Sequence, residues 1–211
     1  MNDRLALLDW RRRVAALYAD VRAAGAGPAA AARFRAGRDR LFAEHPQSPL
    51  GAGRATFAGL RWFPYDPGYR VVAPVEPAPP AWLEVPAGED GVVRLERFGR
   101  VRFVLAGLPA ALHLYWIASY GGGLFLPFRD ATSGRETYGG GRYLLDTIKH
   151  ADLGSDGEAL VLDFNYAYNP SCCYDDRWVC PLAPPENTLP MPVRAGELDF
   201  PRPSPSPAAS A

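Results

Sequence analysis

The 211-residue sequence contains no long hydrophobic run, a single lysine, three cysteines and three histidines. No apolar stretch approaches the roughly 18 residues that a membrane-spanning helix needs. The first residues also lack the apolar region and small-residue cleavage site of a secretory signal. We therefore expect a cytoplasmic protein that does not bind a membrane, with its cysteines as thiols rather than structural disulfides.

An excess of positive charge is also missing, because 23 basic residues balance 23 acidic ones. Without such an excess we expect no bulk attraction to nucleic acid. The charges are uneven, since residues 1–44 carry nine arginines against five acids. A solvated helix face explains this pattern, and a structural or partner-binding module that uses arginine-rich helices is the alternative. Nothing in the sequence fixes the oligomeric state.

Several motifs that would identify an enzyme or a metal site are absent. The chain has no H-E-x-x-H, G-x-S-x-G or EF-hand pattern, and the glycine run 139–141 lacks the Lys-Ser/Thr that ends a phosphate-binding loop. Zinc would need a fourth ligand beside the three cysteines. His45, His113 and His150 lie far from these cysteines in the sequence, and no C-x₂-C spacing occurs. We expect no metal and no cofactor.

The apolar residues, 48% of the chain, suffice for a sizeable core. At the N-terminus they predict a helical hairpin. Residues 3–22 show helical spacing, and a second helix is expected to begin at Pro28 and stop at His45, before Pro46. The apolar positions expected to face inward are Leu5, Leu8, Val14, Leu17, Val21, Phe34, Leu41 and Phe42.

After this hairpin, short β-rich runs recur about every ten residues, each bounded by glycine or proline. Such regular short strands favour an antiparallel sandwich or barrel. Turns of hairpin type are expected at residues 87–91 and at Gly99. The runs are 55–63, 69–75, 81–86, 92–98, 100–106, 111–118, 123–128 and 159–164.

The sequence thus predicts an α+β, mainly-β fold: an antiparallel β-sandwich or flattened barrel with an N-terminal helical hairpin and an irregular C-terminal wrap. Residues 1–46 form the hairpin packed on the core, and residues 47–198 form the β-rich core domain. Residues 199–211 form a disordered tail rich in proline, serine and alanine.

Residues 121–197 mix aromatics, glycine runs, paired charges, amides and all three cysteines. Buried polar groups are costly unless partnered, so this mixture suits a pocket more than a plain core. We expect Arg129 and Arg142 to face one cavity as donors to a carboxylate or phosphate. A loop in which Asp130 caps its own backbone explains part of the same pattern. The expected walls are Tyr138, Tyr143 and Tyr168.

Two chemical roles remain open for that pocket. In the first, it binds a small polar or anionic metabolite. In the second, it is the site of a small-molecule enzyme, hydrolase-like, with Cys172 or Asp163 as the reactive group and Asn165 and Asn169 steadying an oxyanion. The amides also have a simpler explanation, in which they tie down the backbone of the irregular C-terminal segment.

The cysteines have several interpretations besides buried thiols. A Cys172–Cys180 disulfide would close a short loop, although the compartment argues against it. A bond between the adjacent Cys172 and Cys173 would be strained. A catalytic thiolate would need a cationic or histidine partner that the sequence does not reveal.

Several longer segments resemble the bacterial and archaeal family called domain of unknown function 1684. They are LPFRDATSGRETYGGGRYL, DFNYAYNPSCCY, CPLAPPEN and RAGE, with GLRWFPYDPGYRV upstream. The resemblance covers about residues 3–198 and implies no assigned activity. It places recurrent cysteines at Cys172 and Cys180, and many members resemble exported lipoproteins, in which a disulfide there would be natural. The shared motif set, and our candidate ligand contacts, are Arg129, Asp130, Thr132, Tyr138, Arg142, Tyr143, Asn165, Tyr168, Asn169, Glu186 and Asn187.

Overall fold

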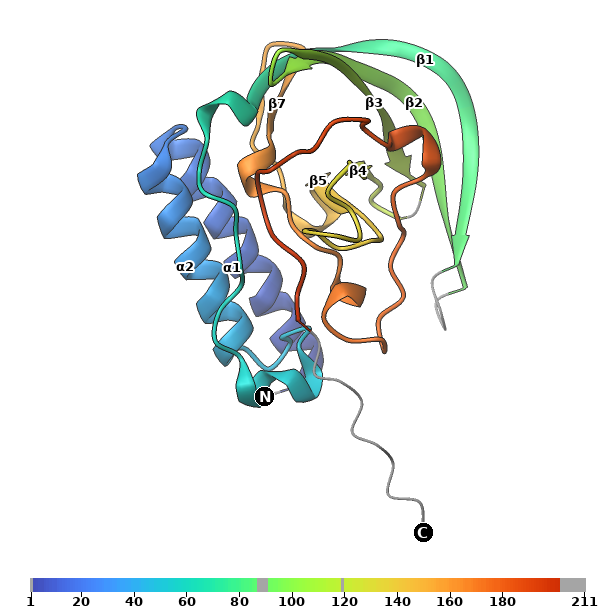
Figure 1. The fold of residues 1–211 in the computed structure, drawn as a ribbon. Helices are drawn as coiled ribbons and strands as arrows, with labels where there is room; N and C mark the ends of the chain where they lie inside the picture. The colour runs from blue at the N-terminus through green and yellow to red at the C-terminus, as the bar shows by residue number, and fades with distance from the viewer. Residues whose placement is uncertain (1, 87–90, 119, 202–211) are drawn as a thin grey trace.

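A helical hairpin opens the chain in the computed structural model, which describes residues 2–86, 91–118 and 120–201 (Figure 1). Helix α1 (Asp3–Ala24) begins where the Asn2 side chain accepts the N–H of Arg4 at 2.9 Å, a typical N-cap. Helix α2 (Pro28–Glu44) has proline in its first turn and ends one residue before the expected stop at His45. The predicted hairpin is confirmed.

The buried face of the hairpin differs in part from the expected stripe. Phe34, Leu41 and Phe42 are buried as predicted, yet Leu5 is 59% exposed and Leu8 is 42% exposed. These two positions are wrong because Ala6, rather than either leucine, faces inward at the start of α1. The first turns of α1 therefore contribute little apolar burial.

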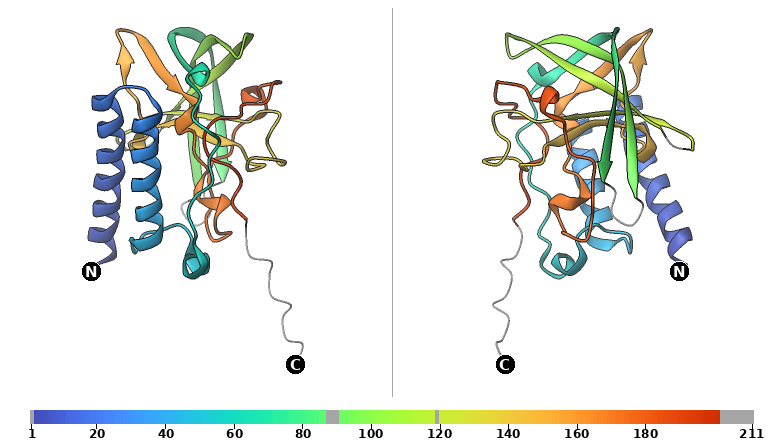
Figure 2. Two further views of the ribbon diagram at one scale, coloured as in Figure 1. Left: turned by 60° about the vertical axis from the view of Figure 1, so that its left-hand side comes forward. Right: turned by 90° about the vertical axis from the view of Figure 1, so that its right-hand side faces the viewer.

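Seven strands form one antiparallel sheet in the order β5-β4-β3-β2-β1-β7-β6. The mainly-β, α+β class is confirmed. Figure 2 shows the two helices as a separate layer beside this β-rich part. The strands are β1 (Arg70–Pro86), β2 (Val92–Leu105), β3 (Leu108–Ile117), β4 (Gly123–Phe128), β5 (Arg142–Asp146), β6 (Ser155–Asp156) and β7 (Ala159–Asp163).

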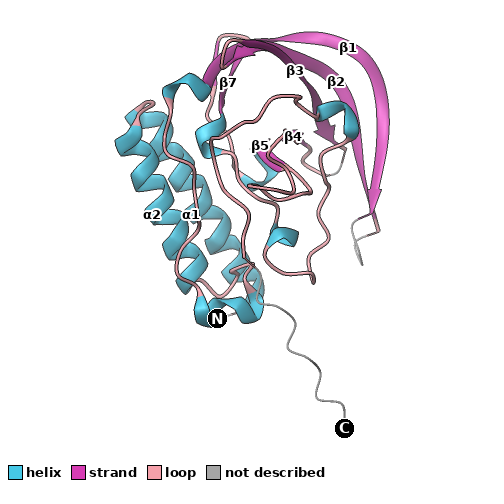
Figure 3. Cartoon of the chain, in the orientation of Figure 1, coloured by secondary structure: helices cyan, strands magenta, loops and turns pink. Residues whose placement is uncertain are grey.

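The sheet is single and not closed, so the second layer expected of a sandwich is supplied by irregular chain. The C-terminal segment runs mostly as loop within the curve of the sheet (Figure 3). Its residues Leu189, Met191, Val193 and Ala195 share one buried cluster with apolar residues of the strands, Leu114 among them. The predicted C-terminal wrap therefore takes the place of a second sheet.

Two pairs of predicted strands are each one long strand. Runs 69–75 and 81–86 merge into β1, and runs 92–98 and 100–106 merge into β2. Gly99 is thus not a hairpin turn but lies at a register shift inside β2, where an added Cβ would come 3.1 Å from the Glu76 carbonyl oxygen. Glycine marks a bulge here, which looks like a turn in the sequence.

Other strand boundaries also shift. Pro86 pairs with Val92, as expected if a hairpin turn joins them, while residues 87–90 lie outside the described residues. The run 55–63 is not a strand: it contains the end of a 3₁₀ turn and a single bridge from Trp62 to Glu197. Strand β5 was not expected.

The central strands are buried on both faces, as their apolar pattern predicts. Leu114 and Tyr115 are adjacent and both 0% exposed. Leu114 lies in the cluster with the C-terminal chain, and Tyr115 lies in a second cluster with Tyr18 and Phe34 of the hairpin. The sheet therefore joins two cores.

The expected disordered tail begins later than residue 199. The ring of Phe200 lies 5.4 Å from that of Tyr174 and 6.4 Å from that of Phe57, so it packs against the core. The rest of the predicted tail, residues 202–211, lies outside the described residues.

Gly196→Ala is expected to destabilise the fold more than Gly134→Ala. Both glycines have positive φ, 82° and 79°, so each alanine costs roughly 1–2 kcal/mol of backbone strain. Only at Gly196 would the new Cβ lie 2.7 Å from two carbonyl oxygens, those of Ala167 and Phe164. Overpacking there adds about 1–3 kcal/mol, measurable by urea unfolding. Equal losses at the two positions would show that the close approach costs nothing.

Candidate functional site

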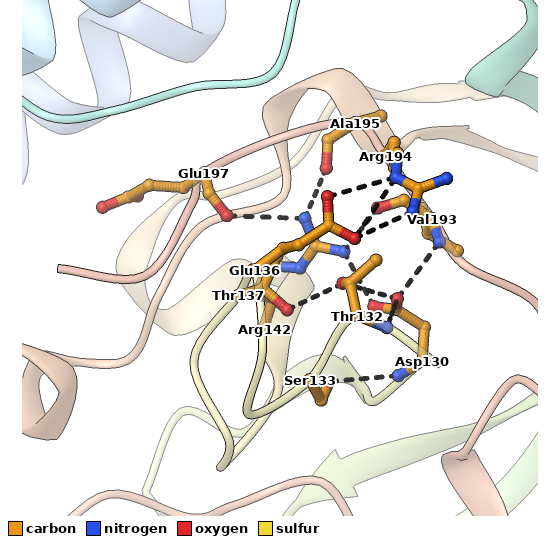
Figure 4. A network of polar contacts seen from close by, with 10 residues as sticks. All are labelled: Asp130, Thr132, Ser133, Glu136, Thr137, Arg142, Val193, Arg194, Ala195 and Glu197. Carbon is orange, nitrogen blue, oxygen red and sulfur yellow. Dashed lines mark hydrogen bonds and ion pairs between the residues drawn. The ribbon is translucent and has the colours of Figure 1, made fainter.

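Arg142 and Asp130 form a buried ion pair at the centre of the motif-rich segment (Figure 4). The Nη2 atom of Arg142 lies 2.8 Å from Oδ2 of Asp130, and the two side chains are 1% and 0% exposed. The other carboxylate oxygen of Asp130 accepts the N–H and hydroxyl of Thr132 at 2.8 and 2.6 Å and the N–H of Val193 at 3.1 Å. The Asp130 carboxylate is therefore fully partnered.

The same guanidinium holds the C-terminal chain. Arg142 donates to the backbone carbonyls of Val193, at 2.9 Å, of Ala195, and of Glu197, at 3.4 Å. Burial lowers the pKa of Arg142, and Asp130 opposes that shift. An arginine enclosed in this way serves the fold, which differs from the expected role as an anion donor. Arg129 is half-buried, and its backbone pairs with Asn187 and Leu189.

The predicted amides also hold backbone segments together. Asn187 accepts the N–H of His113 at 2.8 Å and donates to the carbonyls of His113 and Pro127. Asn165 accepts the N–H of Asp66 at 3.0 Å and returns a bond to its carbonyl at 2.8 Å. These contacts match the simpler explanation of the amides.

Asp163 and Glu186 occupy different surroundings. Asp163 is 2% exposed and accepts from the backbone and side-chain N–H groups of Asn165 at 3.0 and 2.8 Å, so it caps the 3₁₀ turn Phe164–Tyr166. Burial raises its pKa. Glu186 is exposed and accepts the hydroxyl of Tyr115 at 3.0 Å. Neither arrangement joins the carboxyl groups into one site.

A different place in the molecule has the character of a binding site. A cavity of about 60 Å³ lies between the helical hairpin and residues 168–174. Tyr168 and Asn169 belong to the predicted set, whereas the helical side of the cavity was not predicted. The lining residues are Trp10, Val14, Tyr18, Arg38, Phe42, Pro49, Lys149, Ala151, Tyr168, Asn169, Ser171 and Tyr174.

Arg38 is the cation of this cavity. Its Nη2 atom lies 3.2 Å from Oε2 of Glu197 and 3.3 Å from the hydroxyl of Tyr174. The Tyr174 hydroxyl in turn donates to Glu197, whose side chain is 1% exposed. Burial raises the pKa of Glu197, while Arg38 opposes that shift. The guanidinium also stacks over the rings of Phe42 and Tyr168, at 4.7 and 4.9 Å.

Three buried polar atoms of the lining residues have no hydrogen-bond partner among the described residues. They are the Tyr18 hydroxyl, Nε of Arg38 and Oδ1 of Asn169. The residues are 2%, 8% and 1% exposed, respectively. Native proteins leave few buried polar groups unpaired, so three around one cavity is an unusual concentration.

The spacing of α2 contained a signal for this arginine. Arg38 lies four residues after Phe34 and four before Phe42, so all three share one face of the helix. A charged residue within an apolar helical stripe needs a buried partner. That partner, Glu197, comes from the far end of the chain, which the local pattern could not indicate.

The predicted tyrosines are divided between two places. Tyr168 lines the cavity and donates to Asp146 at 3.3 Å, and Tyr143 packs edge-on against it with ring centroids 5.6 Å apart. The hydroxyl of Tyr138 instead lies 3.6 Å from the sulfur of Cys172.

Cys172 and Cys180 are close together as thiols, joined by a hydrogen bond between their side chains. This bond and burial raise the pKa of Cys172, which weakens it as a reactive group. The same bond lowers the pKa of Cys180 to about 6, helped by the charge of Lys149. Sequence reasoning considered Cys172, and the structure makes Cys180 the more acidic thiol. Burial raises the pKa of Cys173.

Two searches of the described residues gave no further site. No helix among them is both long and apolar enough to cross a bilayer. Within the same residues, no group of three or more histidine, cysteine or acidic side chains could hold a metal ion.

Comparison with known proteins places these features in a family. The search of curated proteins gives no match. The solution NMR structure of an uncharacterized protein from Haloarcula marismortui is similar: it has 39% sequence identity and a TM-score of 0.58, and the match covers 79% of this chain and 91% of that one. The family model described as a protein of unknown function (DUF1684) matches residues 55–198, which include the Asp130–Arg142 pair and Glu197. The chain therefore belongs to the DUF1684 family.

Proposed function

We propose that the protein binds a small hydroxycarboxylate in the cavity beside Arg38. The observation that carries the proposal is the set of three unpartnered polar atoms on the lining residues Tyr18, Arg38 and Asn169. Nε of Arg38 can only donate, Oδ1 of Asn169 can only accept, and the Tyr18 hydroxyl can do either. A molecule with acceptor oxygens and one hydroxyl would satisfy all three.

The size and charge of the cavity support a short, singly charged molecule. A water needs about 10–15 Å³ of such volume, so about 60 Å³ accommodates roughly four to six non-hydrogen atoms. Arg38 and Glu197 balance each other, and Lys149 adds a half-exposed positive charge at the lining. Trp10, Val14 and Phe42 supply apolar walls, as is usual for ligand sites.

Lactate and glycolate are expected to raise the melting temperature, and propionate and acetate, which lack the hydroxyl, less so. At a ligand concentration of 100 times Kd the stabilisation is about 2.7 kcal/mol, or about 5–10 °C for a chain of this size. Tyr18→Phe should remove most of the shift because it deletes one contact. The measurement is a thermal melt of the full chain with each acid at constant ionic strength.

Tyr166→Phe is the matched control. Tyr166 is also 2% exposed with an unpartnered hydroxyl among the described residues, but it lines a different cavity, beside Arg70 and Asp163. This variant should keep the full response to lactate. The proposal fails if lactate does not stabilise the wild type, or if it stabilises Tyr18→Phe as much as the wild type.

A further inference from the structure

Cys172 and Cys180 are brought together by a short folded loop. The carboxylate of Asp175 accepts the N–H of Arg177 at 3.0 Å, and its carbonyl accepts the N–H of Trp178 at 3.2 Å. The indole N–H of Trp178 then donates to the carbonyl of Pro49 at 3.1 Å, which fixes the loop to the turn after α2. Two thiols eight residues apart thus meet in a defined geometry.

The hydrogen bonds around the pair all point toward Cys180. Its sulfur accepts from the thiol of Cys172 and from the backbone N–H groups of Cys172 and Ser171. The ammonium group of Lys149 contributes a favourable charge. Hydrogen bonds and a nearby cation stabilise a thiolate, which is the nucleophilic form of cysteine. They lower the pKa of Cys180 to about 6.

Exposure also distinguishes the two thiols. Cys172 is 9% exposed, whereas Cys180 is half-buried and can be reached from solvent. The chain beside Cys180 presents apolar surface, because Val179 is 52% exposed and Leu182 is 36% exposed. An external reagent therefore meets Cys180 first.

We propose that Cys180 and Cys172 form a thiol–disulfide exchange site, in which Cys180 attacks a small disulfide substrate and Cys172 resolves the product. In the first step the Cys180 thiolate bonds to one sulfur of R–S–S–R, and R–S⁻ leaves. In the second step Cys172 loses its proton to the released thiolate and attacks the Cys180 sulfur. The Cys172–Cys180 disulfide forms, the second R–S⁻ leaves, and two electrons have passed to the substrate.

Tyr138 has a place in the second step as a positioning residue. Its hydroxyl lies 3.6 Å from the Cys172 sulfur and acts to lower the pKa of that thiol. Once Cys180 is in the mixed disulfide, this hydroxyl is directed at the sulfur that must ionise. The titratable groups that face the pair are Lys149, Tyr138, Tyr143 and Cys173. The exchange site is independent of the cavity ligand proposed above.

The test uses the reduced full chain and 5,5′-dithiobis(2-nitrobenzoate), whose released thiolate is coloured. At pH 6 the fast phase should be roughly tenfold faster than with free cysteine, after allowing for the lower nucleophilicity of an acidic thiolate. Wild type and Cys173→Ala should each release two equivalents per chain and end as the internal disulfide. Cys172→Ser should release one and retain a mixed disulfide, and Cys180→Ser should lose the fast phase.

Two further measurements do not depend on cysteine variants that fold poorly. Brief alkylation of the wild type, followed by peptide mass mapping, should label Cys180 first. Lys149→Gln should slow the fast phase several-fold at pH 6 and less at pH 9, with the same final yield. Labelling of Cys172 or Cys173 before Cys180 would overturn the proposal. So would a wild-type reaction at pH 6 no faster than that of free cysteine, or one that stops at a stable mixed disulfide.

Discussion

Arg142→Met should lower the free energy of unfolding by about 3–5 kcal/mol. The substitution leaves the Asp130 carboxylate buried without its cation and leaves the carbonyls of Val193 and Ala195 without a donor. Breaking one partner of a buried ion pair costs this much because the remaining charge is uncompensated. Urea unfolding followed by circular dichroism measures the loss.

Arg194→Met is the matched control for this prediction. Arg194 comes from the same C-terminal segment and makes a two-pronged ion pair with Glu136, but the two side chains are 59% and 39% exposed. Its loss should cost no more than about 1 kcal/mol. If Arg142→Met is as mild as Arg194→Met, the buried pair does not hold the wrap. An arginine that served only to bind an anion would give that mild result.

Alkaline pH should unfold the protein steeply above about pH 10. Tyr18, Tyr143, Tyr168 and Tyr174 are buried, and burial raises the pKa of each. The unfolded value is about 10, so these groups stabilise the fold fully below that pH, and the stabilisation is lost as the pH rises toward their folded-state values. Four such groups together remove about 5 kcal/mol per pH unit.

Tyrosinate absorbance and circular dichroism should therefore change together in a pH titration. Tyr18→Phe deletes one of the four groups, and its hydroxyl has no hydrogen-bond partner among the described residues. This variant should keep its stability at neutral pH and lose about 1.4 kcal/mol per pH unit of the alkaline slope. Ionisation of the buried tyrosines while the folded spectrum persists would contradict the prediction.

Local patterns predicted the parts of the fold that depend on local physics. Helix caps and helical spacing located α1 and α2 to within two residues, because capping and amphipathic burial act over a few residues. Gly99 misled, since a glycine that permits close approach inside a strand looks the same in sequence as one in a turn. The single curved sheet was also beyond local patterns. It depends on the long strand β1, which bonds to β2 and β7 along different parts of its length.

The candidate site was predicted only on one side. Sequence reasoning selected Tyr168 and Asn169 because they lie in a polar, aromatic segment, and both line the cavity. It missed Tyr18 and Arg38, since their polar atoms are recognisable only when the hairpin meets that segment. The acidity of Cys180 was equally hidden, because Lys149 reaches it through the fold and not through the sequence.

The wrap that closes both cores sets a condition on biosynthesis. Glu197 pairs with Arg38, 159 positions earlier in the chain, and its carbonyl and those of Val193 and Ala195 receive Arg142. A ribosome delivers these groups last, after the hairpin and every strand have emerged. Until then Arg38 and Asp130 lack their C-terminal partners, and the nascent chain cannot complete either core. Folding is therefore finished after translation, and a chain truncated before residue 189 should stay a client of chaperones.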